Sequence, residues 1–315
     1  MKKFWQLAAA ATLAISMLAA CGEEKETQQE DQKIAVEENN DVAFPVTVTD
    51  ALGKEITLEE APERIVSLTP SNTEILFGLG LDEEVVGVND NDNYPEQVAE
   101  KTRIGGIEYN IETIISLQPD VVFAHESSMF TFESALEQLE ASGVTVFVVE
   151  NAENFDETYE TIEVIGTLTG KDEEADKIIA SIQSKLADIQ AKLQGVAPKT
   201  AFMVVGASPD IYVVGQNTFM NEMLKEINVE NAVKEEGWPL YSAEQFIAAN
   251  PDSIVFTYAG DDETIKNNPA FAVMTAIQNN ALTVVDGDTT SRQGPRLAEG
   301  VESLAKAIYP EVFND

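Results

Sequence analysis

Two glutamates stand at matching places in the two halves of the chain. In the segment 112–120 (ETIISLQPD), Glu112 opens a predicted helix and Pro119-Asp120 starts a predicted buried strand. The segment 244–252 (EQFIAANPD) repeats this arrangement with the same spacing, from Glu244 to Pro251-Asp252. If a pseudo-two-fold axis relates the halves, the two carboxylates lie on one edge of the molecule, one per lobe. The alternative is that each glutamate only complements the positive end of its own helix.

A second set of residues follows the ends of the predicted strands. In open parallel sheets, ligands bind beyond the carboxyl ends of the strands, so we expect a ligand site there. Aromatic side chains with a few polar neighbours suit a large ligand with flat apolar faces and a polar rim. The candidate ligand-binding residues are Ser71, Asn91, Tyr94, Tyr109, His125, Ser127, Tyr212, Trp238, Tyr258 and Arg292.

Several of these residues have two interpretations. Arg292 either contacts an anionic group of the ligand or pairs with one of the many acidic residues of the chain. His125 is the only histidine, which excludes a metal site with several histidine ligands. It either ligates an iron or cobalt atom axially or is a polar residue of the cleft. Each tyrosine either lines the cleft or belongs to the core.

The sequence lacks the motifs of the common α/β enzymes. The turn Leu68-Thr69-Pro70-Ser71-Asn72, after the first buried strand, has no G-x-G-x-x-G pattern. Neither a P-loop nor a G-x-S-x-G elbow occurs, and one histidine leaves little room for a catalytic triad. Glu112 and Glu244 could form the acid pair of a glycosidase, but both open helices rather than line a cleft. We therefore do not expect an enzyme.

The elements that must position these residues alternate between strands and helices in both halves. This alternation predicts an α/β fold with mostly parallel sheets. Between the halves, apolar residues from Ala175 to Leu193 recur every three or four positions, which predicts an amphipathic helix over 172–194. We expect this long α-helix to join two Rossmann-like lobes as a stiff strut that allows only a small closing motion. The alternative is an ordinary surface helix within one domain.

The N-terminus has the features of a lipoprotein signal. Lys2 and Lys3 precede an apolar run, and Cys21, the only cysteine, follows small residues in a pattern that resembles a lipobox. We expect Cys21 to be lipidated and to anchor the protein to the outer face of the cytoplasmic membrane. The alternative is a plain secretory peptide with an incidental cysteine. The formal net charge of −37 argues against a nucleic-acid partner.

These patterns predict five segments along the chain. A polar segment rich in Glu, Gln, Asp and Asn follows the signal and should be a disordered tether, because it has too few apolar residues to bury. The predicted division is a signal peptide (1–20), the lipidated tether (21–43), an N-terminal α/β lobe (44–169), the linking helix (170–197) and a C-terminal α/β lobe (198–315).

From about residue 44 to 309, the chain resembles periplasmic-type binding proteins for ferric siderophores, cobalamin and haem. The segments that carry the resemblance are 46–53, 62–68, 72–74, 94–95, 104–106, 110–112, 237–239 and 294–296. The resemblance implies two lobes around one ligand cleft, a partner ABC permease dimer with separate ATPase subunits, and a monomeric carrier without a cofactor of its own. It also implies that Glu112 and Glu244 dock onto arginines of the permease.

Within that family, the cobalamin-binding branch is the most similar. Trp238 matches an aromatic residue of its pocket, and Tyr212 falls near another. Bulkier residues of that branch are replaced here by Asn91, Gly106, Val205 and Thr289, which implies a wider or more polar pocket. We therefore expect a carrier of a corrinoid or a ferric siderophore. Haem is the alternative within this class, and a secreted hydrolase or glycosidase is the alternative from another class.

Overall fold

The computed structural model describes residues 44–313. The predicted signal peptide, the tether as far as residue 43 and Cys21 lie outside these residues. The described residues belong to one compact unit. The predicted boundaries at residues 44, 170 and 198 remain predictions.

The first half of the described chain forms a parallel sheet of five strands in the order β5-β4-β3-β6-β7. Its strands are β3 (Ile65–Ser67), β4 (Val85–Val88), β5 (Thr102–Arg103), β6 (Val121–His125) and β7 (Val146–Val149). The helices around it are α1 (Pro70–Gly78), α2 (Ile111–Ser116), α3 (Met129–Ala141) and α4 (Phe155–Thr169), with 3-10 turns at Glu96–Glu100 and Glu126–Ser128. Both faces of β6 are buried, which explains why its sequence is apolar almost throughout. The predicted hairpin precedes this sheet as β1 (Val46–Thr49) and β2 (Glu55–Leu58).

The second half forms another, mixed sheet in the order β11-β9-β8-β12-β13, with β10 paired to the start of β8. Its strands are β8 (Lys199–Gly206), β9 (Ile211–Val213), β10 (Val229–Asn231), β11 (Leu240–Tyr241), β12 (Ser253–Phe256) and β13 (Leu282–Val284). Only the short β9 runs against its neighbours. The helices are α6 (Phe219–Glu226), α7 (Ala243–Ala249), α8 (Asp261–Lys266), α9 (Thr275–Gln278), α10 (Gly287–Ser291), α11 (Leu297–Ile308) and α12 (Pro310–Phe313), with a 3-10 turn at Pro269–Val273.

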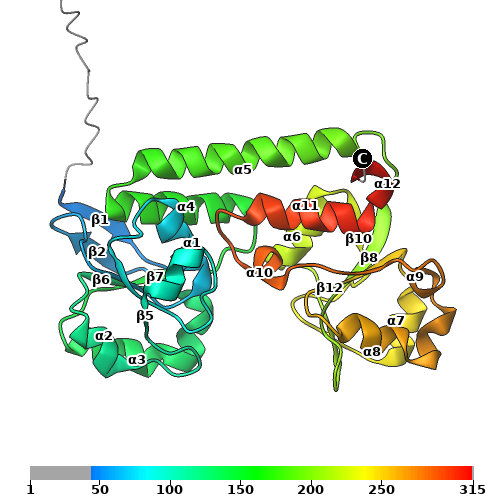
Figure 1. Ribbon diagram of the computed structural model, residues 1–315, viewed down its shortest axis with the longest axis horizontal. Coiled ribbons are helices and arrows are strands. Elements are labelled where there is room, and N and C mark those ends of the chain that lie inside the picture. Colours follow the sequence, from blue (N-terminus) through cyan, green and yellow to red (C-terminus); the bar gives the residue numbers. More distant parts are fainter. Residues whose placement is uncertain (1–43, 314–315) are drawn as a thin grey trace, which may run out of the picture. The chain divides into compact units, whose positions relative to one another are not determined.

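Helix α5 (Asp172–Leu193) connects the two sheets. Its buried residues form the predicted stripe: Ala175, Ile179, Ile182, Leu186, Ile189 and Leu193. Acidic residues occupy its first turn and Lys192 its last, as the helix dipole favours. The helix packs against α4 of the first lobe and α11 of the second (Figure 1).

One apolar core runs through both lobes. It contains Phe123 and Phe147 from the first sheet, Met203 and Val255 from the second, and the α5 stripe. Smaller cores cover the other face of each sheet. The two sheets are therefore separate, and α5 is the long helix that joins them, which confirms the predicted fold class.

The structure corrects one local prediction at the start of α1. The spacing of Ser71 and Glu74 indicates a capping box, but the N-cap is Thr69 and no side chain caps this helix. Pro70 occupies the first helical turn, where its missing N–H costs nothing. Glu74 instead faces the second lobe, and its partners there are described below.

Candidate functional site

The carboxyl ends of the strands in the second sheet border a cavity of about 470 Å³. Val205 lines it near the end of β8, Thr257 lines it just beyond β12, and Asp286 lies just beyond β13. Trp238 and Tyr258, both predicted site residues, lie in its wall and are 51% and 62% exposed. This is the edge of a parallel sheet at which ligands are expected.

A third aromatic residue reaches this region through a short pairing of strands. Tyr212 in β9 lies opposite Leu240 in β11, and both side chains are about half exposed. Leu240 follows Trp238 by two residues along the chain, so the pairing brings Tyr212 close to Trp238. Together with Trp238 and Tyr258, they add exposed apolar surface to this edge, and a contiguous surface of this kind is one mark of a binding site.

The first lobe contributes two of the predicted tyrosines. Tyr94 is nearly half exposed, and the guanidinium of Arg296 lies 4.1 Å from its ring centroid. Tyr109 is less exposed, because its ring packs 4.1 Å from that of Phe132 and its hydroxyl donates to the Leu68 carbonyl at 3.2 Å. Burial raises the pKa of Tyr109 to about 12, so this hydroxyl remains a hydrogen-bond donor.

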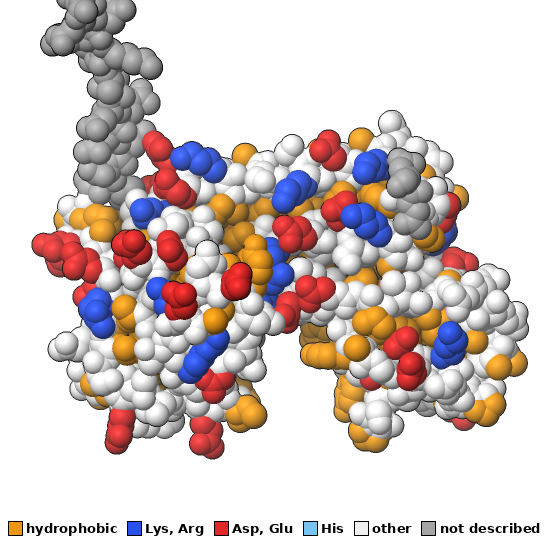
Figure 2. Space-filling view, viewed as in Figure 1, with side chains coloured by type: hydrophobic (Ala, Val, Ile, Leu, Met, Phe, Trp, Pro, Cys, Tyr) orange, Lys and Arg blue, Asp and Glu red, His pale blue; other side chains and the backbone are white. Residues whose placement is uncertain are grey.

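Two apolar residues at the carboxyl edge of the first sheet were missed in the sequence. Phe130 and Ile107 are almost fully exposed; Phe130 follows β6 at the start of α3, and Ile107 follows β5. Figure 2 shows hydrophobic side chains on both walls of the hollow between the lobes. Each could have been found in the sequence as an apolar residue within a polar segment that follows a predicted strand.

Four other predicted residues lie in the first lobe, and three of them, His125, Ser127 and Asn91, form hydrogen bonds. His125 is buried, and its Nδ1 lies 2.8 Å from the Ser127 hydroxyl and accepts from the Ser127 backbone N–H. Burial lowers the pKa of His125 to about 4, so the imidazole is neutral near pH 7. Ser71 is buried in α1, whereas Ser127 is exposed. Asn91 is exposed, and its backbone N–H bonds the Asn89 side chain.

Arg292 belongs to an ion-pair network that crosses from one lobe to the other. Its Nη1 donates to Glu74 Oε1 at 2.7 Å and its Nη2 to Asp288 Oδ1 at 2.9 Å. Arg296 donates to both oxygens of Glu74, at 2.8 Å and 2.5 Å. Asn93 joins the network by donating to Asp288 at 2.7 Å. Of the two interpretations offered for Arg292, the ion pair is the arrangement seen here.

A buried acid of the first lobe lies beside this network. Asp92 accepts from the Thr73 hydroxyl at 3.1 Å, and its other carboxylate oxygen has no hydrogen-bond partner. Burial raises the pKa of Asp92 to about 6, against the opposing effect of the Thr73 bond and of Arg292. Sequence reasoning missed both Asp92 and Glu74, because their partners come from distant parts of the chain.

The repeated Glu…Pro-Asp segments have the same local structure in both lobes. Asn110 caps α2 and Ser242 caps α7, each two residues before the glutamate. Asp120 accepts from the Arg64 N–H at 2.9 Å, and Asp252 accepts from the Thr200 N–H at 2.8 Å. The two segments therefore share their helix caps and backbone hydrogen bonds as well as the spacing of their residues.

Glu112 and Glu244 themselves are exposed and form no ion pair among the described residues. In Figure 1, their helices α2 and α7 both lie on the side away from α5. The two carboxylates are thus available to a partner, one on each lobe.

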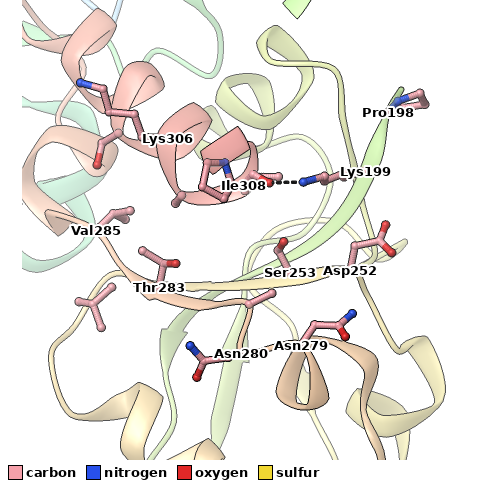
Figure 3. Close-up of a pocket in the computed structure, with 15 residues that line it drawn as sticks. Pro198, Lys199, Asp252, Ser253, Asn279, Asn280, Thr283, Val285, Lys306 and Ile308 are labelled. Atoms are coloured by element: carbon pink, nitrogen blue, oxygen red, sulfur yellow. Dashed lines mark hydrogen bonds between the residues drawn. The ribbon is translucent and has the colours of Figure 1, made fainter. Parts of the chain in front are cut away.

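A larger cavity, of about 720 Å³, lies at the opposite edge of the second sheet (Figure 3). Lys199, Asp252 and Ser253 line it at the amino ends of β8 and β12. Lys199 is already engaged, because it donates to the Ile308 carbonyl and pairs with Glu311, each at 2.7 Å. We regard the carboxyl edge as the functional site, since the exposed aromatic residues gather there and not in this larger cavity.

The described part of the chain shows neither a cluster of metal ligands nor a helix that could span a membrane. Within residues 44–313, no group of three or more His, Cys, Asp or Glu side chains is placed to hold a metal ion. In the same range, no helix has the length and hydropathy needed to cross a membrane.

The chain matches known proteins along its length. The model of the periplasmic binding protein family matches residues 65–289. An uncharacterized ABC transporter substrate-binding lipoprotein of Bacillus subtilis, YvrC, is 41% identical over 319 residues, covering 100% of both chains. A cobalamin-binding protein of Halobacterium salinarum is 26% identical over 283 residues, covering 85% of this chain and 75% of that protein.

A solved structure agrees with these matches. It is that of a possible iron-binding, periplasmic solute-binding protein from Staphylococcus epidermidis, with 36% identity and a TM-score of 0.74. The match covers 79% of this chain and 100% of that one. The residues matched by the family model, 65–289, include both sheets and α5, so that match concerns the whole two-lobed fold. The chain therefore belongs to the periplasmic binding protein family.

Proposed function

We propose that this protein is the substrate-binding lipoprotein of an ABC importer and captures a bulky metal chelate between its lobes. The observation that carries the proposal is the set of exposed aromatic side chains at the carboxyl edges of both sheets: Tyr94, Tyr212, Trp238 and Tyr258. Such side chains suit the flat apolar faces of a large chelate. The relative in Bacillus subtilis, which is matched over its whole length, supports the carrier role.

A corrinoid is our first candidate ligand, because a relative in Halobacterium salinarum is a cobalamin-binding protein. A ferric siderophore is the second, supported by the Staphylococcus epidermidis protein described as possibly iron-binding. Haem is the remaining candidate of this class, although His125 is poorly placed to ligate its iron, because it is buried and its Nδ1 is bonded to Ser127.

We further propose that the protein catalyses no reaction. Glu112 and Glu244 lie on separate lobes, on exposed helix starts, which does not suit the paired acids of a glycosidase. A hydrolase of the Ser-His-Asp type needs a histidine within reach of an activated serine and an orienting acid. The only histidine, His125, is buried and bonds Ser127, which is its neighbour two positions along the chain.

The ligand proposal can be tested by tryptophan fluorescence. Trp238 is the reporter, because the other of the two tryptophans, Trp5, lies in the predicted signal peptide. Titration of the purified mature protein with cyanocobalamin, haem and a panel of ferric siderophores should quench Trp238 saturably for one of them. Isothermal calorimetry provides the control for absorption by these coloured ligands. If none of them binds by either method, the chelate proposal is wrong.

For delivery, we propose that Glu112 and Glu244 dock the two lobes onto arginines of a permease dimer, while a separate subunit hydrolyses ATP. The mature protein would act as a monomer, held at the outer face of the cytoplasmic membrane by lipidated Cys21. Support comes from the matched local structure of the two glutamates and from their lack of ion-pair partners among the described residues.

Charge reversal separates docking from ligand binding. The double variant Glu112→Lys/Glu244→Lys should abolish uptake by cells and leave ligand affinity unchanged. The matched control is Glu137→Lys/Asp188→Lys, which changes the net charge equally at exposed positions of α3 and α5. Equal loss of uptake in both double variants would refute docking through Glu112 and Glu244, and so would a loss of ligand affinity in the first.

A further inference from the structure

The basic residues near the carboxyl edges of the two sheets are all engaged with other protein groups. Arg292 and Arg296 share Glu74. Arg103 donates to the carbonyls of Asn89 at 2.7 Å and Asp92 at 2.9 Å. Lys234, in the loop after β10, pairs with Glu230 at 2.8 Å. Among the described residues of these edges, a negatively charged ligand would therefore have to displace an existing partner to gain a cation.

The acidic residues at the same edges are less fully neutralised. Asp286 lines the cavity beside Trp238 and Tyr258, and its side chain is 56% exposed. Its nearest cation, Arg296, is 3.9 Å away and already binds Glu74. Asp288 lies in the same wall. The carboxylate of Asp286 thus presents negative charge to the cavity.

The opposite lobe also carries negative charge at this edge. Glu150 directly follows β7, and Glu126 follows β6. Partial burial and repulsion from Glu157, Glu126 and Glu160 raise the pKa of Glu150. Both sheets thus carry acidic residues at their carboxyl ends, and a field of one sign around a site favours ligands of the other sign and disfavours ligands of the same sign.

We propose that this site selects metal chelates without net negative charge, and that Asp286 is a residue that sets this preference. The inference rests on the proposed carrier function and narrows its ligand class. A neutral chelate gains apolar contact with Trp238 and Tyr258, and a cationic one gains in addition from Asp286 and from the aromatic faces. An anionic chelate, such as haem with its two carboxylates or a ferric tris-catecholate, meets repulsion without a free arginine or lysine to offset it.

The test uses two chelates, each in three forms that carry a positive, a zero or a negative charge on one peripheral group. The first series is cyanocobalamin, its derivative with one side-chain amide hydrolysed to a carboxylate, and the amine made by coupling that carboxylate to ethylenediamine. The second series is ferrioxamine B with its free amine, its N-acetyl form and its N-succinyl form. Haem and a ferric tris-catecholate complete the set, and affinities are measured by calorimetry at low and high salt.

In the series that binds, we expect the anionic form to bind about tenfold more weakly than the neutral form at low salt. Salt should reduce this difference, because it screens exposed charges. Asp286→Asn should also reduce it, while the asparagine still accepts the bond from the Asp288 N–H that caps α10. The control Asp188→Asn removes the same charge from the exposed face of α5 and should leave the difference unchanged.

Other outcomes overturn the inference. If the anionic form binds as well as the neutral one, or if haem or the tris-catecholate binds most tightly, the charge preference is wrong and the carrier function stands. If Asp188→Asn acts as strongly as Asp286→Asn, the net charge of the chain determines the preference, and the role of Asp286 is wrong. If no chelate binds at all, the proposed function fails and the inference fails with it.

Discussion

Glu74 binds two arginines of the other lobe, and its side chain is only 2% exposed. A buried carboxylate shared by two guanidinium groups is costly to remove, because both cations then lose their one buried acidic partner in a poorly solvated place. The same residue type on the surface contributes little, since water screens exposed pairs. Burial, rather than the number of ion pairs, therefore decides which charges matter for stability here.

Glu74→Gln should lower the free energy of unfolding by about 3 kcal/mol, since glutamine keeps the size of the side chain but cannot neutralise Arg292 and Arg296. Urea denaturation of the mature protein measures this. The control is Glu302→Gln, which breaks the exposed pair with Lys306 and should cost no more than about 1 kcal/mol. Equal losses in both variants would contradict the role given to Glu74.

His125 and Asp92 affect the pH dependence of stability in opposite directions. Burial lowers the pKa of His125 from 6.5 to about 4, so the unfolded chain takes up this proton first and stability falls as the pH drops through that range. Burial raises the pKa of Asp92 from 3.8 to about 6, so the folded protein takes up its proton first and stability rises as the pH drops from 6 toward 3.8.

Each group can be replaced by asparagine, which does not titrate. As the pH falls from about 6.5 to 4.5, the free energy of unfolding of Asp92→Asn should fall by about 2 kcal/mol relative to that of the wild type. That of His125→Asn should rise by about as much relative to the wild type. Urea denaturation at several pH values gives both slopes. The two variants serve as controls for each other, because they should depart from the wild type in opposite directions. If both curves of stability against pH run parallel to that of the wild type, neither group titrates as described.

At the scale of elements, the sequence predicted what depends on neighbours along the chain. The stripe of α5 and the repeated Pro-Asp turns follow from local periodicity and turn chemistry, and both were confirmed. The pairing of β9 with β11 was not predicted, because a strand of two residues has no period to detect. The partners of Glu74 lie 218 and 222 residues away, and no local pattern connects them.

The same distinction applies to the candidate site. Tyr258, which follows β12, and Trp238, in the loop before β11, both line the cavity at the carboxyl edge, and their role as ligand-binding residues stays a prediction. Whether a polar residue there is free or already bonded could not be predicted, as Arg292 and His125 illustrate. That property depends on which distant side chains arrive at the same place.

Helix α5 stabilises both lobes through one apolar stripe. Ile182→Ala should lower the free energy of unfolding by about 2–4 kcal/mol, because it leaves a void in the core that both sheets share. Trp238 fluorescence and far-UV circular dichroism should still report one coincident transition. The control Gln183→Ala, on the exposed face of the same helix, should change little. Separate transitions for the two probes would show that the lobes unfold independently.

At the scale of the whole molecule, α5 is one of several links between the lobes. The rings of Phe155 in α4 and Phe219 in α6 lie 5.9 Å apart. Asn93 bonds Asp288 across the lobes at 2.7 Å, and Glu74 binds the two arginines. A hinge is free to move when a few loop residues absorb the change. Here a large closing motion would have to disrupt the core that both lobes share and the buried ion pairs of Glu74.

We therefore predict that ligand binding closes the lobes by only a few degrees. Small-angle X-ray scattering of the mature protein, with and without a saturating chelate, should give nearly the same radius of gyration. Glu74→Gln removes one link and leaves α5 in place, so its radius of gyration should change more on binding than that of the wild type. Glu302→Gln, which breaks an exposed pair that is not part of the interlobe network, should behave as the wild type. A large drop for the wild-type protein would refute the stiff hinge.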